Sequence, residues 1–137
     1  MASEFLVEII TPERSFFCEM VKSVILPTSD GLMSIWKGHE TMVISVLPGE
    51  LQINKANKWL SCTVATGFVE VRPDETIIFT QAAEWPEEID IKRAEEAKER
   101  ATERLRQRLS EKEYMSNKIA LARAMARLSL SKRKFKL

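Results

Sequence analysis

The second half of this chain contains neither glycine nor proline. All 5 prolines and all 4 glycines lie within the first 86 residues, and none occurs from Glu87 to Leu137. Because these two residue types are the strongest helix breakers, the second half is free to form long helices. The first half, in contrast, has the frequent breaks typical of short strands. The sequence therefore predicts an α+β chain whose two halves differ in structure.

Cysteine is scarce, and long hydrophobic runs are absent. Cys18 and Cys62 have neither the spacing of metal ligands nor the number that a disulfide framework needs. We expect two free thiols, buried or half-buried, in a reducing compartment. No run of about 18 apolar residues is available to span a membrane, and residues 1–5 lack the pattern of a signal peptide. We expect no direct insertion into a membrane.

Sequence motifs for catalysis are missing as well. There is no glycine-rich phosphate loop, no nucleophile elbow and no cluster of metal ligands. The single histidine, His39, lies in a predicted turn without a cysteine or serine partner, and no enclosed pair of carboxylates is indicated. The sequence therefore favours a binding or regulatory protein over an enzyme. We expect no catalytic residue, no metal and no required cofactor.

The first half of the chain is a series of short apolar runs separated by turn residues. The predicted strands are residues 5–10, 20–26, 32–36, 41–47, 50–53, 59–64, 67–71 and 76–81. Eight or so short strands with closely spaced turns are typical of an antiparallel β-sandwich or a flattened barrel. We predict such a domain over residues 1–86.

The second half is predicted to form a two-helix hairpin. Asp90 is well placed as the N-cap of a first helix over residues 91–109. Ser110 and Glu113 fit a capping box for a second helix, which is expected to extend to about residue 129 and to be followed by a frayed basic tail. Since no glycine or proline enforces the break, one continuous helix remains an alternative.

The charge of the chain changes sign at the same place as its predicted structure. Residues 1–86 carry 6 Lys and Arg against 11 Asp and Glu, whereas residues 87–137 carry the remaining 15 against 9. The helical half is therefore basic, and its expected partners are anions such as phosphates, nucleotides or acidic protein surfaces. Nucleic acid is not an expected partner, because many acids and no alternating aromatics accompany these bases.

Arginines fall on shared faces of the two predicted helices. Arg93, Arg100 and Arg104 follow one another at spacings of seven and four on the first helix, and Arg123 and Arg127 are four apart on the second. A folded hairpin would bring both sets together into a pocket for a polyphosphate, since guanidinium groups match phosphate oxygens. The alternative is that these arginines are solvated and paired with neighbouring glutamates.

Five stretches, in order along the chain, carry a resemblance to a known family. They are Ile10–Arg14; Gly38-His39 with Val46–Leu51; Gly67–Val71 with Pro73; Ile89–Ala94; and Ala120–Leu128. In these stretches the chain resembles the epsilon subunit of F-type ATP synthase, and the match extends over nearly the whole chain.

This resemblance implies a rotor subunit of a proton-translocating complex. Its β-sandwich would bind the gamma subunit and touch the membrane rotor ring, at the cytoplasmic face of the bacterial plasma membrane. Its two helices would be mobile. When extended, they would reach the catalytic alpha and beta subunits and inhibit ATP hydrolysis, whereas bound ATP, a regulatory ligand, would favour the folded form.

The resemblance also implies site residues. The regulatory ATP site would comprise Glu84, Ile89, Asp90, Arg93, Ala94, Arg100, Arg123 and Arg127. The subunit interface would include Leu32, Gly38 and His39. Leu32 stands where the family often has an acid, which is a departure at the contact with the rotor ring.

Two other functions remain open from the residues alone. One is a stand-alone nucleotide-sensing regulator with the same sandwich and hairpin. The other is an anion-binding module that works through the basic helices and whose binding would weaken steeply with salt.

Overall fold

Alternating apolar residues give the first half strands with one buried face. In β1 (Phe5–Ile10), the side chains of Phe5, Val7 and Ile9 are fully buried, while the residues between them are partly exposed. The computed structural model describes residues 4–107 and 110–134, except for the side chains of residues 133 and 134. The further strands are β2 (Ser15–Val21), β3 (Ser23–Thr28), β4 (Gly31–Trp36), β5 (Met42–Val46), β6 (Gly49–Lys55), β7 (Lys58–Val64), β8 (Gly67–Val71), β9 (Glu75–Thr80) and β10 (Ala83–Glu84).

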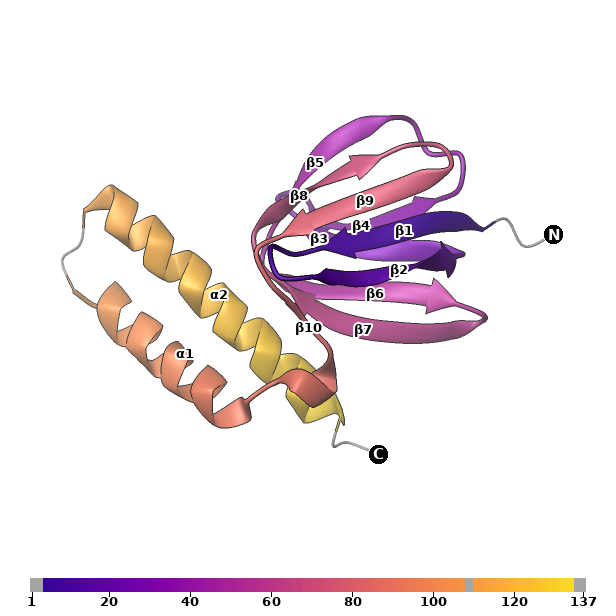
Figure 1. Ribbon diagram of the computed structural model, residues 1–137. Coiled ribbons are helices and arrows are strands. Elements are labelled where there is room, and N and C mark those ends of the chain that lie inside the picture. The colour runs from indigo at the N-terminus through magenta and orange to yellow at the C-terminus, as the bar shows by residue number, and fades with distance from the viewer. Residues whose placement is uncertain (1–3, 108–109, 135–137) are drawn as a thin grey trace.

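The strands form a sandwich that is nearly closed into a barrel (Figure 1). Their order is β10-β7-β6-β3-β5-β8-β9-β1-β2, with β4 paired to β3. All pairs are antiparallel except that of β1 with β9, which is parallel. The interior is filled by side chains from both walls, among them Leu26, Ile35, Leu51 and Ile78. The predicted fold class, a β-sandwich followed by two helices, is confirmed.

One predicted strand was wrong. The run at residues 20–26 was expected to be a single strand, but it contains the end of β2 and most of β3. The chain leaves β1 at Val21 and joins β4 and β6 at Ser23, with the N–H of Lys22 donating to the carbonyl of Asn54 at 2.8 Å. The alternation of apolar residues continues through this crossing, so it does not reveal that the chain changes partner strands.

The two cysteines differ in their environments. Cys62 is buried, and burial, followed by the nearby Glu50 carboxylate, raises the pKa of its thiol to about 12. Cys18 is exposed on β2, opposite Glu8 of β1. The expectation that both thiols are buried or half-buried is therefore wrong for Cys18, because its side chain lies on the outer face of an edge strand.

The second half folds as a hairpin of α1 (Ile91–Leu105) and α2 (Glu111–Lys134). Ser110 provides the break: its hydroxyl accepts from the N–H of Glu113 at 3.2 Å and donates to the Glu113 carboxylate at 2.9 Å. The predicted end of the first helix, Leu109, lies outside the described residues. Neither of the described helices is long and apolar enough to cross a membrane.

The second helix is longer than the sequence predicted. It was expected to end near residue 129, but it continues to Lys134, with Leu130 and Ser131 only 4% and 2% exposed. Packing against the rest of the protein holds this last turn, and a local pattern does not report such packing. The frayed tail was therefore the wrong prediction for residues 131–134, and residues 135–137 lie outside the described part.

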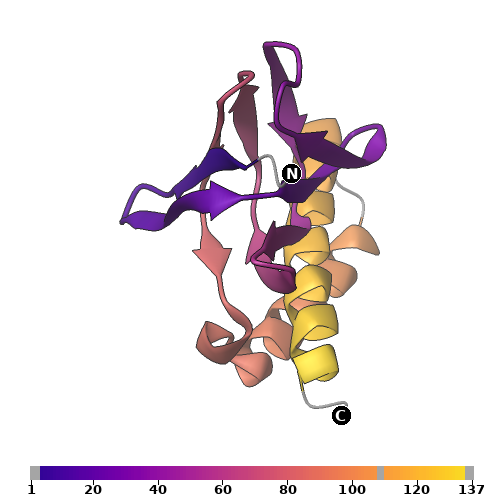
Figure 2. The same cartoon turned by 90° about the vertical axis from the view of Figure 1, so that its right-hand side faces the viewer.

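The hairpin lies along one side of the sandwich, as Figures 1 and 2 show. α1 packs mainly against α2, and α2 in turn packs against β6, β7 and the short 3-10 helix η1 (Pro86–Glu88). The side chains of Ala124, Leu128 and Leu130 are buried in this arrangement. The hairpin is therefore attached to the sandwich chiefly through the C-terminal half of α2.

Gly67, at the start of β8, is a position where only glycine fits. A Cβ added there would lie 1.9 Å from the carbonyl oxygen of Phe79 and 2.8 Å from the Cα of Thr80. Both atoms are backbone, so the sheet itself would have to shift. We expect Gly67→Ala to lower the midpoint of thermal unfolding by roughly 10 °C.

Thr66→Ala, at an exposed neighbouring position, is the control and should melt as the wild type does. Circular dichroism of both variants measures the difference. A Gly67→Ala midpoint within about 2 °C of wild type would show that the close approach of β8 and β9 is not a constraint.

Candidate functional site: an arginine-lined cavity between the helices

The start of α1 is set by Asp90. Its backbone is extended, and its carboxylate accepts a hydrogen bond from the N–H of Arg93 at 3.1 Å. Asp90 is thus the N-cap that the sequence predicted, and its negative charge also lies at the favourable end of the helix dipole. Ile89, just before it, is only 9% exposed, and Ala94 is only 1% exposed.

Small residues hold the two helices close to each other. Ala94 and Ala101 of α1 and Ala124 of α2 are each 3% exposed or less. Because alanine extends little beyond its backbone, two helices can approach closely along such residues. The long side chains that flank these alanines are thereby brought toward one another.

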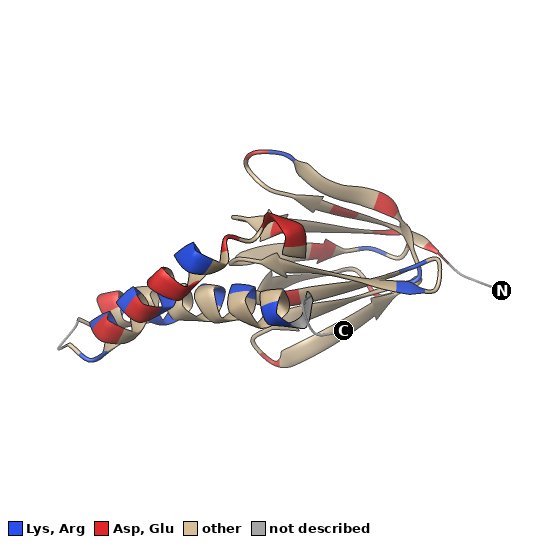
Figure 3. Cartoon of the chain, turned by 90° about the horizontal axis from the view of Figure 1, so that it is seen from below, with Lys and Arg blue, Asp and Glu red and all other residues tan. Residues whose placement is uncertain are grey.

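A cavity of about 480 Å³ lies between the helices next to the edge of the sandwich. Its lining residues are Ala82, Ala97, Arg100, Ala101, Arg104, Asn117, Ala120, Arg123, Ala124 and Arg127. Two arginines come from each helix, and no acid is among the lining residues. The cavity is therefore polar and positively charged, with alanines as its floor. The coloured ribbon in Figure 3 shows that charged residues are more frequent along the helices than in the sandwich.

Two of the four arginines are paired with acids. The Nε of Arg127 donates to the Glu84 carboxylate of β10 at 2.5 Å, which joins α2 to the sandwich. Arg104 lies 3.7 Å from the carboxylate of Glu113 across the hairpin. Within the described part of the chain, the guanidinium groups of Arg100 and Arg123 have no ion pair or hydrogen bond. The cavity thus contains positive charge that the protein itself neutralises only in part.

The predicted ATP-binding residues separate into two groups. Arg100, Arg123 and Arg127 line the cavity, and Glu84 reaches it through its ion pair with Arg127. Ile89, Asp90, Arg93 and Ala94 lie instead at the start of α1 and do not line the cavity. Residues 93 and 100 are two turns apart, or about 10 Å along the helix.

The cavity also includes residues that were not among the predicted ligands. Arg104 was placed on the shared face by its spacing, yet only the folded hairpin brings it into the cavity. Nothing in the sequence indicates that Asn117 lines the cavity, because its position depends on how α2 is rotated relative to α1. The alternative that these arginines are solvated and paired with neighbouring glutamates does not hold for Arg127, which pairs with Glu84 of the sandwich.

The predicted interface residues do not form one patch. Leu32 is 73% exposed near the first end of β4, whereas Gly38 and His39 lie beyond its other end. The strand from Leu32 to Trp36 is about 13 Å long, and Gly38 follows in the turn beyond it. The N–H of Gly38, whose φ of +84° favours glycine, donates to the carbonyl of Pro73 at 2.8 Å.

The fold is thus a β-sandwich that carries a helical hairpin, and among the described residues no group of side chains could hold a metal ion. Comparison with known families agrees. The family model described as "ATP synthase, Delta/Epsilon chain, beta-sandwich domain" matches residues 4–86, and "ATP synthase, Delta/Epsilon chain, long alpha-helix domain" matches residues 87–132.

The chain belongs to the ATP synthase delta/epsilon chain family. It is 48% identical over 130 residues to the ATP synthase epsilon chain of Ruminiclostridium cellulolyticum, covering 95% of this chain and 97% of that one. It is 43% identical over 132 residues to the ATP synthase epsilon chain of Caldanaerobacter subterraneus subsp. tengcongensis, covering 96% of each. Members of this family are non-catalytic subunits of the ATP synthase stalk.

Solved structures share the fold. A chain in the Euglena gracilis mitochondrial ATP synthase (OSCP/F1/c-ring) superposes with a TM-score of 0.78 at 24% identity, covering 94% of this chain and 81% of that one. A chain in the central stalk and c-ring of the Tetrahymena thermophila mitochondrial ATP synthase superposes with a TM-score of 0.66 at 13% identity, covering 94% of this chain and 97% of that one.

The cap of α1 supplies a prediction about Asp90. Asp90→Ala removes the acceptor for the N–H of Arg93, and we expect the first turn of α1 to lose about 1 kcal/mol. Asp90→Asn keeps the cap and should lose much less. Amide hydrogen exchange at Arg93 measures both, and equal exchange in the two variants would contradict the capping role.

Proposed function

We propose that this chain is a rotor subunit that links the gamma subunit to the membrane ring and regulates ATP hydrolysis through its helices. The arginine-lined cavity between α1 and α2 is the observation that carries the regulatory part of this proposal. In the proposed cycle, ATP binds the folded hairpin. The hairpin without ATP extends toward the catalytic alpha and beta subunits and inhibits hydrolysis.

The charge and size of the cavity support ATP as the regulatory ligand. Its volume of about 480 Å³ lies within the range of small-molecule sites. Arginines from both helices line the same cavity, and guanidinium groups suit the oxygens of a polyphosphate. A ligand that contacts both helices contacts them only in the folded hairpin, so its binding stabilises that state.

The start of α1 is proposed as the second part of the same site. Ile89, Asp90, Arg93 and Ala94 match the motif that the family resemblance associates with ATP. Arg93 lies about one helical turn before Ala97, the first residue of α1 that lines the cavity. With Glu84 on β10, the proposed site includes residues of the sandwich edge, of α1 and of α2. ATP bound there would connect the three.

The contact between the hairpin and the sandwich is small, which supports the proposal that the hairpin can leave the sandwich. α1 packs mainly against α2, and of the two helices it is α2 that packs against β6 and β7. The buried residues of α2 include Ala124, Leu128 and Leu130, all in its C-terminal half. The Glu84–Arg127 ion pair adds one polar contact to this interface. A small interface of this kind is consistent with two states that differ by a few kcal/mol.

The sandwich offers an apolar outer face for the gamma subunit. Val43 of β5 is 69% exposed, and Phe68 of β8 is 47% exposed and stacks on Phe79 of β9 at 4.8 Å. These strands lie away from β6 and β7, which the helices cover. Apolar and aromatic side chains gathered on one face are typical of a protein interface.

We propose Leu32, Gly38 and His39 as further contacts with the gamma subunit and the rotor ring. Because Leu32 and the turn containing Gly38 lie at opposite ends of β4, they would contact different parts of the assembly. In this position the protein is a peripheral part of the complex on the cytoplasmic face of the bacterial plasma membrane.

ATP binding is tested by calorimetric titration of the whole protein. We expect Arg123→Ala to weaken ATP binding about tenfold or more, because a charged hydrogen-bond donor is lost. Arg106→Ala is the matched control: Arg106 is the C-cap residue of α1, is highly exposed and does not line the cavity, so its loss should leave the affinity unchanged. Equal affinities of the two variants would exclude the cavity as the ATP site.

Docking on gamma is tested by co-purification. Val43→Asp places an unpaired charge on the proposed face and should abolish or strongly reduce capture of the gamma subunit. Tyr114→Asp, at an exposed position of α2, is the control. Capture of gamma by Val43→Asp at the wild-type level would contradict docking through β5, β8 and β9. ATP binding without any capture of gamma would favour the stand-alone regulator.

A further inference from the structure

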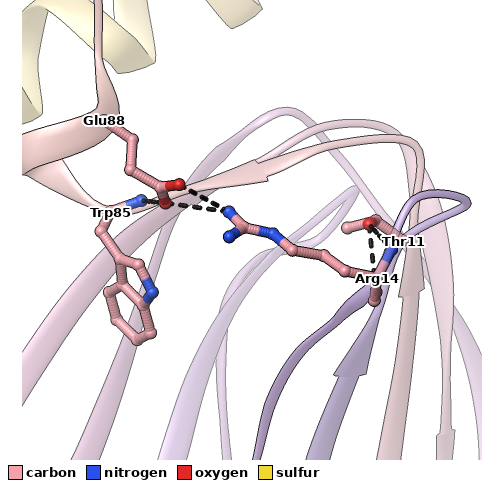
Figure 4. Close-up of polar contacts among 4 residues, drawn as sticks. All are labelled: Thr11, Arg14, Trp85 and Glu88. Carbon is pink, nitrogen blue, oxygen red and sulfur yellow. Dashed lines mark hydrogen bonds and ion pairs between the residues drawn. The ribbon is translucent and has the colours of Figure 1, made fainter.

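The connector between sandwich and helices is fastened to the turn that joins β1 and β2. Figure 4 shows the contact. The Nη2 of Arg14 donates to both carboxylate oxygens of Glu88, at 3.0 and 2.7 Å, and the N–H of Trp85 donates to the same carboxylate at 3.0 Å. Three hydrogen bonds, two of them between opposite charges, thus converge on Glu88.

Aromatic packing reinforces this contact. The ring of Trp85 stacks on Phe16 of β2, with centroids 4.6 Å apart, and meets Phe17 edge-on at 6.2 Å. The guanidinium of Arg14 lies 5.0 Å from the centroid of Phe16. Phe16 and Phe17 are buried members of the sandwich core, so the connector is packed against that core as well as hydrogen-bonded to it.

The turn that contains Arg14 is itself fixed by hydrogen bonds. The hydroxyl of Thr11 accepts from the N–H of Arg14 and donates to its carbonyl, both at 3.2 Å, and the backbone N–H of Thr11 donates to that carbonyl at 2.9 Å. The Arg14 side chain therefore starts from a fixed backbone. We call Arg14, Phe16, Trp85 and Glu88 the connector clamp.

The electrostatics of Glu88 keep the connector clamp closed at neutral pH. The N–H of Trp85 has the largest effect on the pKa of Glu88 and lowers it. Desolvation opposes this, and the hydrogen bond and charge of Arg14 lower the pKa further, so that it lies below its usual value. Because the pKa of Glu88 is lower in the folded protein, its ionised carboxylate stabilises the fold. This stabilisation is complete above the usual carboxyl pKa and is lost as the pH falls through the pKa of the folded state. The carboxylate is therefore ionised throughout the neutral range.

The hydrogen bonds of the connector clamp end at Glu88, and beyond it the side chain of Ile89 is still buried against the rest of the protein. Ile89 and Asp90 have extended backbones, and the N–H of Ile89 makes only a long bond of 3.4 Å to the carbonyl of Pro86. Ile91 then begins α1, which packs mainly against α2. Two extended residues thus separate the last fixed residue of the connector from the first helix.

We infer that the connector clamp makes residues 85–88 part of the sandwich, so that the hairpin pivots at Ile89–Asp90. The pivot rests on the proposed function, since it presupposes that the hairpin moves, whereas the clamp does not. This pivot begins three residues beyond residue 86, where the match to the beta-sandwich family model ends.

The position of the pivot gives the proposed ATP motif a mechanical role. Glu84 and the clamp lie on the sandwich side, Arg93 and the arginine-lined cavity lie on the helix side, and Asp90 is the joint between them. A ligand that contacts Asp90 and Arg93 would therefore bind at the pivot itself. The Glu84–Arg127 ion pair crosses the same pivot and breaks when the hairpin leaves.

Amide hydrogen exchange of the whole protein tests the clamp. We expect the Trp85 amide to exchange about three- to tenfold faster in Glu88→Ala and in Arg14→Ala, because its acceptor is lost or left mobile. Glu87→Ala is the matched control, since Glu87 is the exposed residue next in the chain and makes no hydrogen bond or ion pair within the described part. Unchanged Trp85 exchange in both clamp variants would overturn the inference.

The pivot is tested in the double variant Arg14→Ala/Glu88→Ala. Spin labels at Cys18 on the sandwich and at Glu99→Cys on α1 report the distance between the two parts. We expect a broader distribution of this distance in the double variant than in Glu87→Ala, because the connector becomes a second joint. Identical distributions would place the pivot elsewhere. Failure of ATP to change the distance in wild type would count against the proposed sensor and leave the clamp result intact.

Discussion

The close packing of two alanine-lined helix faces is the constraint on which the candidate site depends. Ala101 and Ala124 are almost fully buried, and around them two arginines from each helix are brought to one cavity. Like charges held together destabilise the folded hairpin unless they are neutralised. Glu84 and Glu113 neutralise two of the four, so a polyphosphate that neutralises the rest stabilises the folded state. In the proposed function, this charge would couple the folding of the hairpin to the binding of an anion.

The size of this coupling is limited by how differently ATP binds the two states. A ligand shifts a two-state equilibrium only by its differential affinity, and a change from mostly extended to mostly folded requires several kcal/mol. The hairpin is attached to the sandwich chiefly through the C-terminal half of α2. The free energy that holds the hairpin on the sandwich is therefore also small. The connector clamp confines the conformational change to a short segment. Residues up to Glu88 remain on the sandwich, and only the backbone of the two residues that follow has to change conformation.

Local patterns in the sequence predicted the fold and the ends of helices that depend on capping. The alternation of apolar residues indicated the sandwich, and Asp90 and Ser110 marked the starts of α1 and α2. The predictions that were wrong concern features that depend on contacts between residues far apart in the sequence. The partner change at Lys22, the exposure of Cys18 and the last turn of α2 are set by which strand or helix lies alongside. The cavity was predicted from helical spacing, but the pairing of Arg127 with Glu84 and the clamp of Arg14 with Glu88 join residues 43 and 74 positions apart.

The most direct test of the account is the distance between the sandwich and α1 with and without ATP. Cys18 is an exposed native thiol on β2, while burial and the raised pKa of Cys62 keep that thiol unreactive, so Cys18 and an added Glu99→Cys can carry the two spin labels. The account predicts that saturating ATP narrows the distribution to the single distance of the docked hairpin. The same distribution with and without ATP, at concentrations where calorimetry shows binding, would contradict it.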